Sequence, residues 1–241
     1  AVDADPTLFR LHYRIGDMFL KKGLPEDALQ HFQEVLKRDD RDALAHEGVG
    51  EAYFRMGKED EAEASFRKAI LLQPDRWQTH NFLGMLFDRQ KRHQDALAEY
   101  EQGLRIRPHE AMLLNNAGLA NYLLGRYEDA ARSFQQALRT GSGQQKIYNN
   151  LGLALAKLNH DHDALESFRK GGSEEEAYNK LGVFYLSNGK AKQAIACFKK
   201  AIELSPRYYD KANDNLATAK RALEKNNKCN QDSTKPWACP S

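Results

Sequence analysis

Glycines recur along this chain at a spacing of 34 residues, and no other feature of the sequence limits its fold as strongly. They are Gly16, Gly50, Gly84, Gly118, Gly152 and Gly182, and only the last interval is shorter, at 30 residues. An alanine follows each glycine after twelve residues, and a phenylalanine or tyrosine follows that alanine after four more. Six copies of this pattern predict a chain built from stacked repeats.

The copy from Ala43 to Arg76 shows what each repeat forms. Its first half, ALAHEGVGEAYFRMG, has apolar residues at helical spacing and ends at Gly57, a residue suited to the left-handed turn after a helix. Its second half, KEDEAEASFRKAILLQP, predicts another helix that Pro74 closes. Two helices joined by a short turn pack antiparallel, so each copy is predicted to be a helix pair.

The turn between the two helices holds a residue of one kind in most copies. Glycine occupies it as Gly23, Gly57, Gly125 and Gly189. Asn159 takes the place in the fifth copy, and asparagine tolerates a positive φ. Lys91 takes it in the third copy, which departs from the pattern.

The stretch VGEAYFRMGKEDEAEASFRKAILLQP resembles the tetratricopeptide repeat nearly throughout. The resemblance extends over six copies, at 9–42, 43–76, 77–110, 111–144, 145–174 and 175–208. It implies an all-α fold, a right-handed α-solenoid of six helix pairs. Such a fold needs a cap for its last apolar face, and residues 209–227 carry the apolar stripe of a C-terminal capping helix.

Three segments differ from the regular array. Residues 1–8 form an N-terminal extension, and residues 228–241 lack periodicity and are expected to be an irregular tail. The fifth copy is four residues short, and Ser173 with Glu176 forms a capping box that starts the next helix early. This shortening predicts a local change of superhelical pitch at 171–174, or else a deletion that the stack absorbs.

Charge and hydropathy exclude several classes of function. The 36 basic residues nearly balance the 34 acidic ones, and a net charge of +2 favours neither nucleic acid nor bulk membrane attraction. No apolar run approaches the roughly 18 residues of a membrane-spanning helix. The family resemblance implies that the partner is a protein or peptide.

The family resemblance assigns binding to positions 2, 5, 9, 12 and 13 of each copy, which line a concave wall. Position 5 holds asparagine in four successive copies, and position 6 adds a partial second row: Asn81, Asn115, Asn149 and Asn179, then Asn116 and Asn150. An amide both donates and accepts hydrogen bonds, so this ladder is predicted to hold the backbone of an extended peptide. Similar ladders, offset by one position, occur in the repeat domains of O-linked N-acetylglucosamine transferases. The alternative is that these residues serve local hydrogen bonding.

Positions 9, 12 and 13 complete the predicted peptide-binding groove. The early wall is acidic and mixed, with Asp17 and Glu51, whereas the later wall is apolar. The candidate groove residues here are Met85, Leu119, Tyr122, Leu153, Val183 and Leu186, with the basic residues Arg55, Arg89 and Lys157 at position 13. An exposed apolar strip with a polar rim normally marks a partner site. The alternatives are that the chain's own segments cover this strip and that the basic residues are simply solvated.

The residues give little support for a carboxylate clamp, a metal site or a catalytic site. The carboxylate clamp that related repeats use for chaperone tails needs lysine at position 5, which no copy supplies. His12, His46 and His80 are interpreted as packing residues, and the run NHDHDAL at 159–165 as a helix start rather than a metal site. The chain has neither a glycine-rich phosphate loop nor a nucleophile elbow, so we expect no catalytic residue, metal or cofactor.

Two of the three cysteines lie close together near the C-terminus. Cys229 and Cys239 flank NQDSTKPWA, and a disulfide between them would place the chain in an oxidising compartment such as a periplasm. The alternative is two free thiols. Cys197 lies in a second helix and is expected to pack as a small apolar residue.

The sequence therefore predicts a non-enzymatic scaffold that binds a partner segment in its concave groove. The stretches at 113–138 and 177–209 resemble bacterial envelope lipoproteins that assist Flp or type IV pilus assembly. Two alternatives stay open: the substrate-recognition domain of a larger enzyme such as a glycosyltransferase, and a self-assembling scaffold that forms homo-oligomers.

Overall fold

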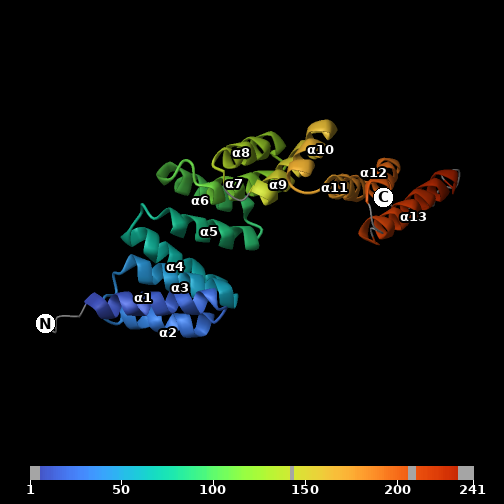
Figure 1. The fold of residues 1–241 in the computed structure, drawn as a ribbon. Helices are drawn as coiled ribbons and strands as arrows, with labels where there is room; N and C mark the ends of the chain where they lie inside the picture. Colours follow the sequence, from blue (N-terminus) through green and yellow to red (C-terminus); the bar gives the residue numbers. More distant parts are fainter. Residues whose placement is uncertain (1–5, 142–143, 206–209, 233–241) are drawn as a thin grey trace. The chain divides into compact units, whose positions relative to one another are not determined.

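The computed structural model describes residues 6–141, 144–205 and 210–232, and it divides the chain into two compact units (Figure 1). Unit 1 is Ala1–Arg126 and unit 2 is Tyr127–Ser241. The division falls between the two helices of the fourth copy, inside the array that the sequence predicts as continuous. All regular structure in the described residues is helical, as the repeat pattern predicts.

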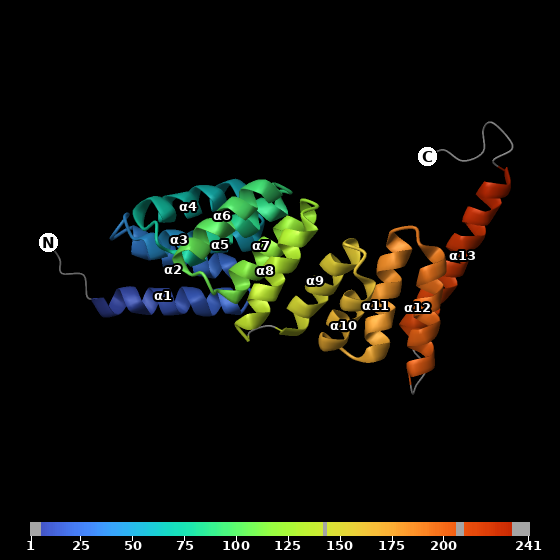
Figure 2. The same cartoon turned by 90° about the horizontal axis from the view of Figure 1, so that it is seen from above.

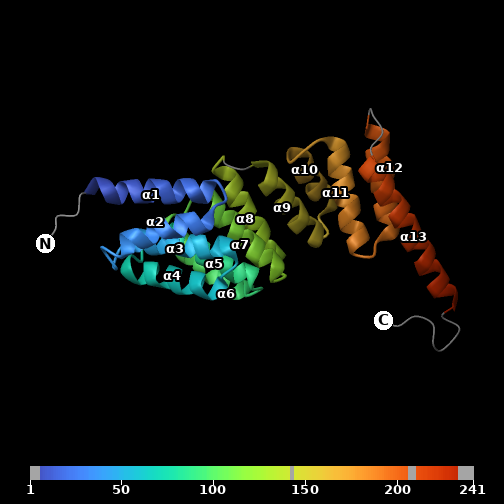
Figure 3. The same cartoon turned by 90° about the horizontal axis from the view of Figure 1, so that it is seen from below.

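Each unit is a series of helices that pack on their neighbours in chain order (Figures 2 and 3). Unit 1 holds α1 (Pro6–Lys21), α2 (Pro25–Leu36), α3 (Ala43–Met56), α4 (Glu59–Leu72), α5 (Trp77–Arg89), α6 (His93–Ile106) and α7 (Ala111–Leu123). Unit 2 holds α8 (Tyr127–Arg139), α9 (Gln144–Lys157), α10 (Asp161–Lys170), α11 (Glu174–Ser187), α12 (Ala191–Leu204) and α13 (Asp210–Asp232). Odd-numbered helices from α1 to α11 are the first helices of the copies, even-numbered ones are the second helices, and α13 is the capping helix.

The turn positions behave as the sequence predicts. All six have a positive φ: Gly23 (74°), Gly57 (75°), Lys91 (60°), Gly125 (77°), Asn159 (61°) and Gly189 (73°). The repeat thus imposes a left-handed residue after each first helix, whatever residue type stands there. At Lys91 the side chain makes this conformation costly, because its Cβ crowds the backbone.

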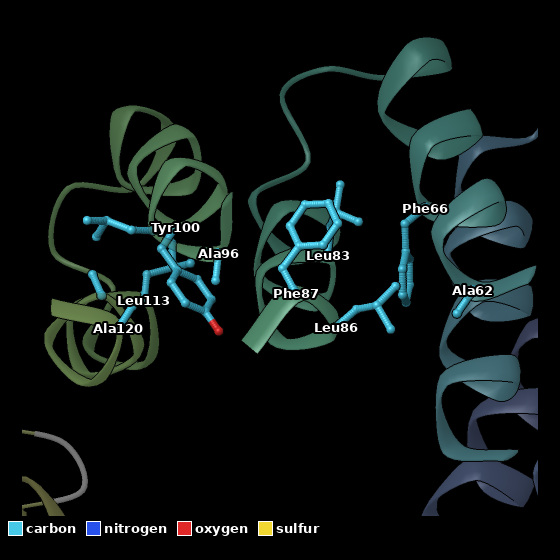
Figure 4. Packing of buried hydrophobic residues seen from close by; sticks show 11 residues of the cluster. Ala62, Phe66, Leu83, Leu86, Phe87, Ala96, Tyr100, Leu113 and Ala120 are labelled. Carbon is cyan, nitrogen blue, oxygen red and sulfur yellow. The ribbon is translucent and has the colours of Figure 1, made fainter. Parts of the chain in front are cut away.

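The core forms where a second-helix aromatic meets the first helix of its own copy. In unit 1, Phe66, Leu83, Phe87 and Tyr100 belong to one buried cluster that joins the second, third and fourth copies (Figure 4). A Cβ placed on Gly84 would lie 2.5 Å from Cε1 of Tyr100, so the ring rests directly on the backbone of α5. Only glycine permits this approach.

The shortened fifth copy changes one helix and its connection. The helix α10 has 10 residues, against 12 to 14 in the other second helices. The next helix begins directly, because the Ser173 side chain accepts a 3.4 Å hydrogen bond from the backbone N–H of Glu176. The predicted capping residue is confirmed, and the predicted change of pitch stays a prediction.

The capping helix is longer than the sequence analysis predicts. It ends at Asp232 instead of residue 227, so residues 228–232, predicted as part of an irregular tail, are helical. No glycine or proline follows Asp210 until Pro236, so no residue in this stretch stops the helix. Ala212 and Ala219 are fully buried, and Leu216 and Leu223 are half-buried, as the predicted apolar stripe requires.

We expect Lys91→Gly to stabilise the chain by about 0.5–1 kcal/mol, because glycine adopts a positive φ without steric cost. The adjacent Gln90 has φ −75°, so Gln90→Gly removes no strain and should lower stability by up to about 1 kcal/mol. Chemical denaturation of both variants beside the parent measures the difference. A loss of stability in Lys91→Gly would contradict the strain at this turn.

Gly84→Ala should destabilise unit 1 by about 1 kcal/mol or more, because the new Cβ overlaps the Tyr100 ring. In a Tyr100→Leu background the same change should cost less, since the ring is gone and alanine is the better helix former. Denaturation midpoints of the parent chain, the two single variants and the double variant form a double-mutant cycle that measures this difference. Equal costs in the two backgrounds would show that the contact does not determine the requirement for glycine.

Candidate peptide-binding surface

The first helices of each unit form a layer of their own. In unit 1, α1 packs on α3, α3 on α5 and α5 on α7, and in unit 2, α9 packs on α11 and α11 on α13. The predicted groove positions lie on these helices. We call their polar and apolar side chains the inner wall of each unit, defined by positions 2, 5, 6, 9, 12 and 13 of the copies.

In unit 1 the position-5 side chains are largely buried. Glu47 is 8% exposed, and Arg76 donates two hydrogen bonds to its carboxylate, at 3.1 and 2.7 Å. The Thr79 hydroxyl donates to the same carboxylate. This buried ion pair is fully partnered, so it links α3 to the start of α5 instead of presenting a free charge.

Asn81 and Asn115, the two unit 1 members of the predicted ladder, are only 4% and 7% exposed. The Asn81 side-chain oxygen accepts a hydrogen bond of 2.9 Å from Nδ2 of Asn116. Nδ2 of Asn81 contacts the sulfur atoms of Met85 and Met112, at 3.4 and 3.6 Å. The Asn81 amide therefore joins neighbouring copies, and little of either side chain's surface reaches solvent.

In unit 2 the corresponding amides are more accessible. Asn149, Asn150 and Asn179 are all partly exposed. The Asn149 oxygen accepts a 3.0 Å hydrogen bond from Nζ of Lys180, and the Asn179 oxygen accepts one of 3.0 Å from Nδ2 of Asn215. In both units, then, a position-5 oxygen is held by a side chain from the next first helix.

The apolar candidates differ in how far they reach solvent. Val183 is 44% exposed, whereas Met85, Leu119, Tyr122, Leu153 and Leu186 are partly buried. Sequence reasoning missed three exposed apolar residues of this wall, Leu44 (40%), Met112 (48%) and Leu123 (56%). Leu44 and Met112 occupy position 2 of their copies, and Leu123 occupies position 13. The family resemblance assigns both positions to the groove, so reading them copy by copy would have found these residues.

The three basic candidates all have partners within the chain. Nη1 of Arg55 donates to the carbonyl oxygen of Leu20 at 2.8 Å. Nη1 of Arg89 donates to that of Phe54 at 2.7 Å, and the Arg89 guanidinium lies 3.6 Å from the centre of the Phe54 ring. Lys157 donates to the side-chain oxygen of Asn188 at 2.8 Å. Each arginine thus holds the last turn of the preceding first helix.

The two carboxylates in the acidic part of the unit 1 wall, Asp17 and Glu51, have raised pKa values. Burial raises the pKa of Glu51 in spite of its hydrogen bonds from Arg55. Burial also raises the pKa of Asp17, opposed by the charge of Lys21. Each of these carboxylates carries a nearby cation, so this region of the wall is not a strong anion.

The predicted packing histidines have partners inside the protein. Nδ1 of His12 lies 3.1 Å from Nδ1 of His31, and the His46 ring lies 2.9 Å from the Asp40 carbonyl oxygen. His80 is buried, with Nδ1 2.7 Å from a Glu99 oxygen and Nε2 3.2 Å from the Pro74 carbonyl. Burial opposes the charged ring, but these two hydrogen bonds and the Glu99 charge raise the pKa of His80 overall.

The run NHDHDAL lies at the start of α10. His162, Asp163 and Glu166 can bring one ligand atom each within 4.8 Å of one another. All three are exposed, and Oε1 of Glu166 forms an ion pair with Nζ of Lys170 at 2.7 Å. Their position in the first turns of α10 agrees with the helix-start interpretation.

Cys197 is a partly buried free thiol, and burial raises its pKa to about 11. It therefore stays protonated at neutral pH and is a poor nucleophile. Cys239 and the side chain of Cys229 lie outside the described residues, so the disulfide between them stays a prediction.

Comparisons with known proteins place the chain among repeat proteins. The profile of the cilia and flagella-associated protein 70 C-terminal domain matches residues 1–180, and the tetratricopeptide repeat profile matches residues 175–208. No curated protein sequence matches the chain. Among the described residues, none of the helices is long and apolar enough to cross a membrane.

Several solved structures share the fold at low sequence identity. MamA from Desulfovibrio magneticus RS-1 is 23% identical, with a TM-score of 0.63, covering 72% of this chain and 98% of its own. YrrB, described as having an unusual peptide-binding site, is 18% identical, with a TM-score of 0.63 and coverages of 79% and 97%. Pseudomonas aeruginosa pilF is 17% identical, with a TM-score of 0.68 and coverages of 88% and 98%. These similarities establish the tetratricopeptide fold.

The raised pKa of His80 predicts a pH dependence of stability. A protonated His80 stabilises the folded chain fully below its unfolded pKa of about 6.5, and this contribution is lost as pH rises through the folded pKa. Denaturant unfolding should therefore show lower stability at about pH 8 than at about pH 6. Glu99→Gln should flatten this dependence, whereas His46→Gln should leave it in place. An unchanged slope in Glu99→Gln would exclude the His80–Glu99 pair as its source.

Proposed function

Because the chain belongs to the family of the cilia and flagella-associated protein 70 C-terminal domain, we propose that it is a non-enzymatic protein-interaction scaffold. Its partner would be a segment of another protein, held along the inner walls. The family name favours a role in a cilium or flagellum. The role in bacterial envelope or pilus assembly, predicted from the resemblance of residues 113–138 and 177–209, stays a prediction, and the fold shared with pilF supports it. The glycosyltransferase and self-assembly alternatives also stay predictions.

The observation that carries this proposal is the exposure of apolar side chains on the inner walls. Leu44, Met112 and Val183 are 40%, 48% and 44% exposed, and each occupies a groove position of its copy. Water contact with such side chains is unfavourable by about 25 cal/mol per Å² of apolar surface. A partner that covers them would gain this free energy, and exposed apolar residues with polar neighbours are typical of protein interaction sites.

The polar residues of the wall support the same function. The ladder amides and the position-13 cations already bond to the chain, so a partner meets a wall that is pre-ordered. Pre-ordering lowers the entropy cost of binding, because few side chains must be immobilised. YrrB, with the same fold, is described as having a peptide-binding site, which supports a peptide as the partner here.

The test uses the full chain and a displayed library of random peptides. Peptides selected on the native chain should bind a Met112→Asp, Val183→Asp variant at least about tenfold more weakly, because each change places a charge against an apolar contact. Leu71→Asp is the matched control: Leu71 is an apolar residue with 76% exposure, but it lies on the second helix α4. If every selected peptide bound the double variant with full affinity, the inner walls would be excluded as the peptide-binding site.

A further inference from the structure

Two histidines from adjacent helices meet inside the first copy. Nδ1 of His12, on α1, lies 3.1 Å from Nδ1 of His31, on α2. Both side chains are partly exposed, so solvent reaches the pair. The His31 ring also stacks on Phe19, with the ring centres 5.5 Å apart, and this contact helps to hold its orientation. The two helices therefore direct the same ring nitrogen of each histidine toward the other.

The pair occupies positions 4 and 23 of its copy, and the third copy shows what these positions do elsewhere. There Nδ1 of His80 lies 2.7 Å from a carboxylate oxygen of Glu99, which balances the charge of a protonated ring. The first copy has a second imidazole in place of this carboxylate. Position 4 alone indicated packing, and the partner at position 23 becomes visible in the folded helix pair.

The distance between the two nitrogens suits a shared metal ion. The hydrogen bond between them uses a single proton, because one neutral imidazole donates and the other accepts. A metal ion can replace that proton, since the nitrogen of a neutral imidazole is a common metal ligand. Two nitrogens at about 2.0–2.1 Å from one zinc ion, at a tetrahedral angle, lie about 3.3 Å apart. The observed 3.1 Å is close to this value, so small ring rotations admit the ion.

Glu34 offers an oxygen ligand beside the pair. It follows His31 by three residues on α2, and residues at this spacing share a helix face. Its side chain is 47% exposed and forms an ion pair of 2.6 Å with Lys37, so it can turn without disturbing the core. Lys37 lowers the pKa of Glu34 and the charge of His12 lowers it further, so Glu34 lies within electrostatic range of the histidines.

We propose that His12 and His31 bind a zinc ion between α1 and α2, with Glu34 as the third ligand and water as the fourth. Nitrogen and carboxylate ligands in this number are typical of zinc sites that keep one open position. Mg²⁺ and Ca²⁺ prefer oxygen ligands, so they should not replace zinc here. The site uses positions 4 and 23, which do not belong to the inner wall, and it is independent of the proposed function.

The ion would join the two helices of the copy in which the first helix is least covered. Among the described residues, α1 packs on α2 and α3 alone. Leu11 and Met18 on α1 are 50% and 42% exposed, so this helix buries less apolar surface than the first helices that follow. Zinc bound to ligands from both helices would stabilise their packing, because the complete site exists in the folded copy.

The test is a calorimetric titration of the full chain with Zn²⁺, with Cys229→Ser and Cys239→Ser in every sample so that the tail thiols do not bind the ion. His31→Ser removes one ligand, and the second copy already holds Ser65 at position 23 opposite His46, so the fold is kept. The affinity of the site should fall at least tenfold, since loss of even an outer-shell partner costs about 10–100-fold. His12→Tyr removes the other ligand, in agreement with Tyr148 and Tyr178 at position 4 of later copies, and should have the same effect.

His162→Gln is the matched control. His162 belongs to the exposed group with Asp163 and Glu166 at the start of α10, so it represents the other candidate ligands of the described residues. This variant should bind Zn²⁺ as the parent does. A loss in His162→Gln equal to that in His31→Ser would overturn the inference, and so would parental affinity in both His31→Ser and His12→Tyr. Parental affinity in Glu34→Gln would exclude Glu34 as the third ligand.

Thermal unfolding gives a second readout. Zn²⁺ at about 100 times its Kd should raise the denaturation midpoint of the parent by about 5 °C or more. The same concentration of Mg²⁺ should leave the midpoint unchanged, and Zn²⁺ should not raise it in His31→Ser. An equal rise with Zn²⁺ in the parent and in His31→Ser would show that the ion acts elsewhere and would overturn the inference.

Discussion

The contact between a glycine backbone and an aromatic ring is the constraint on which the repeat fold depends, and five copies show it. A Cβ placed on the glycine would lie 2.5 to 2.6 Å from the ring in Gly16–Phe32, Gly50–Phe66, Gly84–Tyr100, Gly152–Phe168 and Gly182–Phe198. The ring fills the space that a side chain would occupy and sets how closely the two helices of a copy approach. The close approach in turn places the polar positions of each first helix on one face.

Polar contacts between copies then order that face. The position-5 oxygens of Asn81 and Asn149 accept hydrogen bonds from the next first helix, and that of Asn179 accepts one from the capping helix α13. Glu47 accepts from Thr79 of the next copy. These bonds compensate the burial of polar groups at the helix contacts.

Much of the fold could be predicted from the sequence, because it depends on local and periodic features. The glycine and aromatic period predicts the helix pairs, and the turn position predicts a positive φ even at Lys91 and Asn159. The extension of α13 to Asp232 was missed, since no single residue marks where that helix ends. The division after Arg126 was missed as well.

The candidate site was harder to predict, because an asparagine in a row of asparagines can bond along the row or toward a ligand. The sequence places Asn149 and Asn179 at groove positions, but it does not reveal that Lys180 and Asn215 hold their oxygens. Exposure depends on neighbouring copies too, which is why Asn81 and Val183, both on the predicted wall, differ so widely in the surface they present.

The bonds from Arg55 to Leu20 and from Arg89 to Phe54 link one first helix directly to the next, over 35 residues of chain, without involving the second helices. These bonds therefore hold the layer of first helices together without a contribution from the second helices. Insertions and surface changes can accumulate on the second helices while the spacing between neighbouring first helices stays constant. A recognition surface of this kind can be conserved in geometry even where the sequence around it diverges.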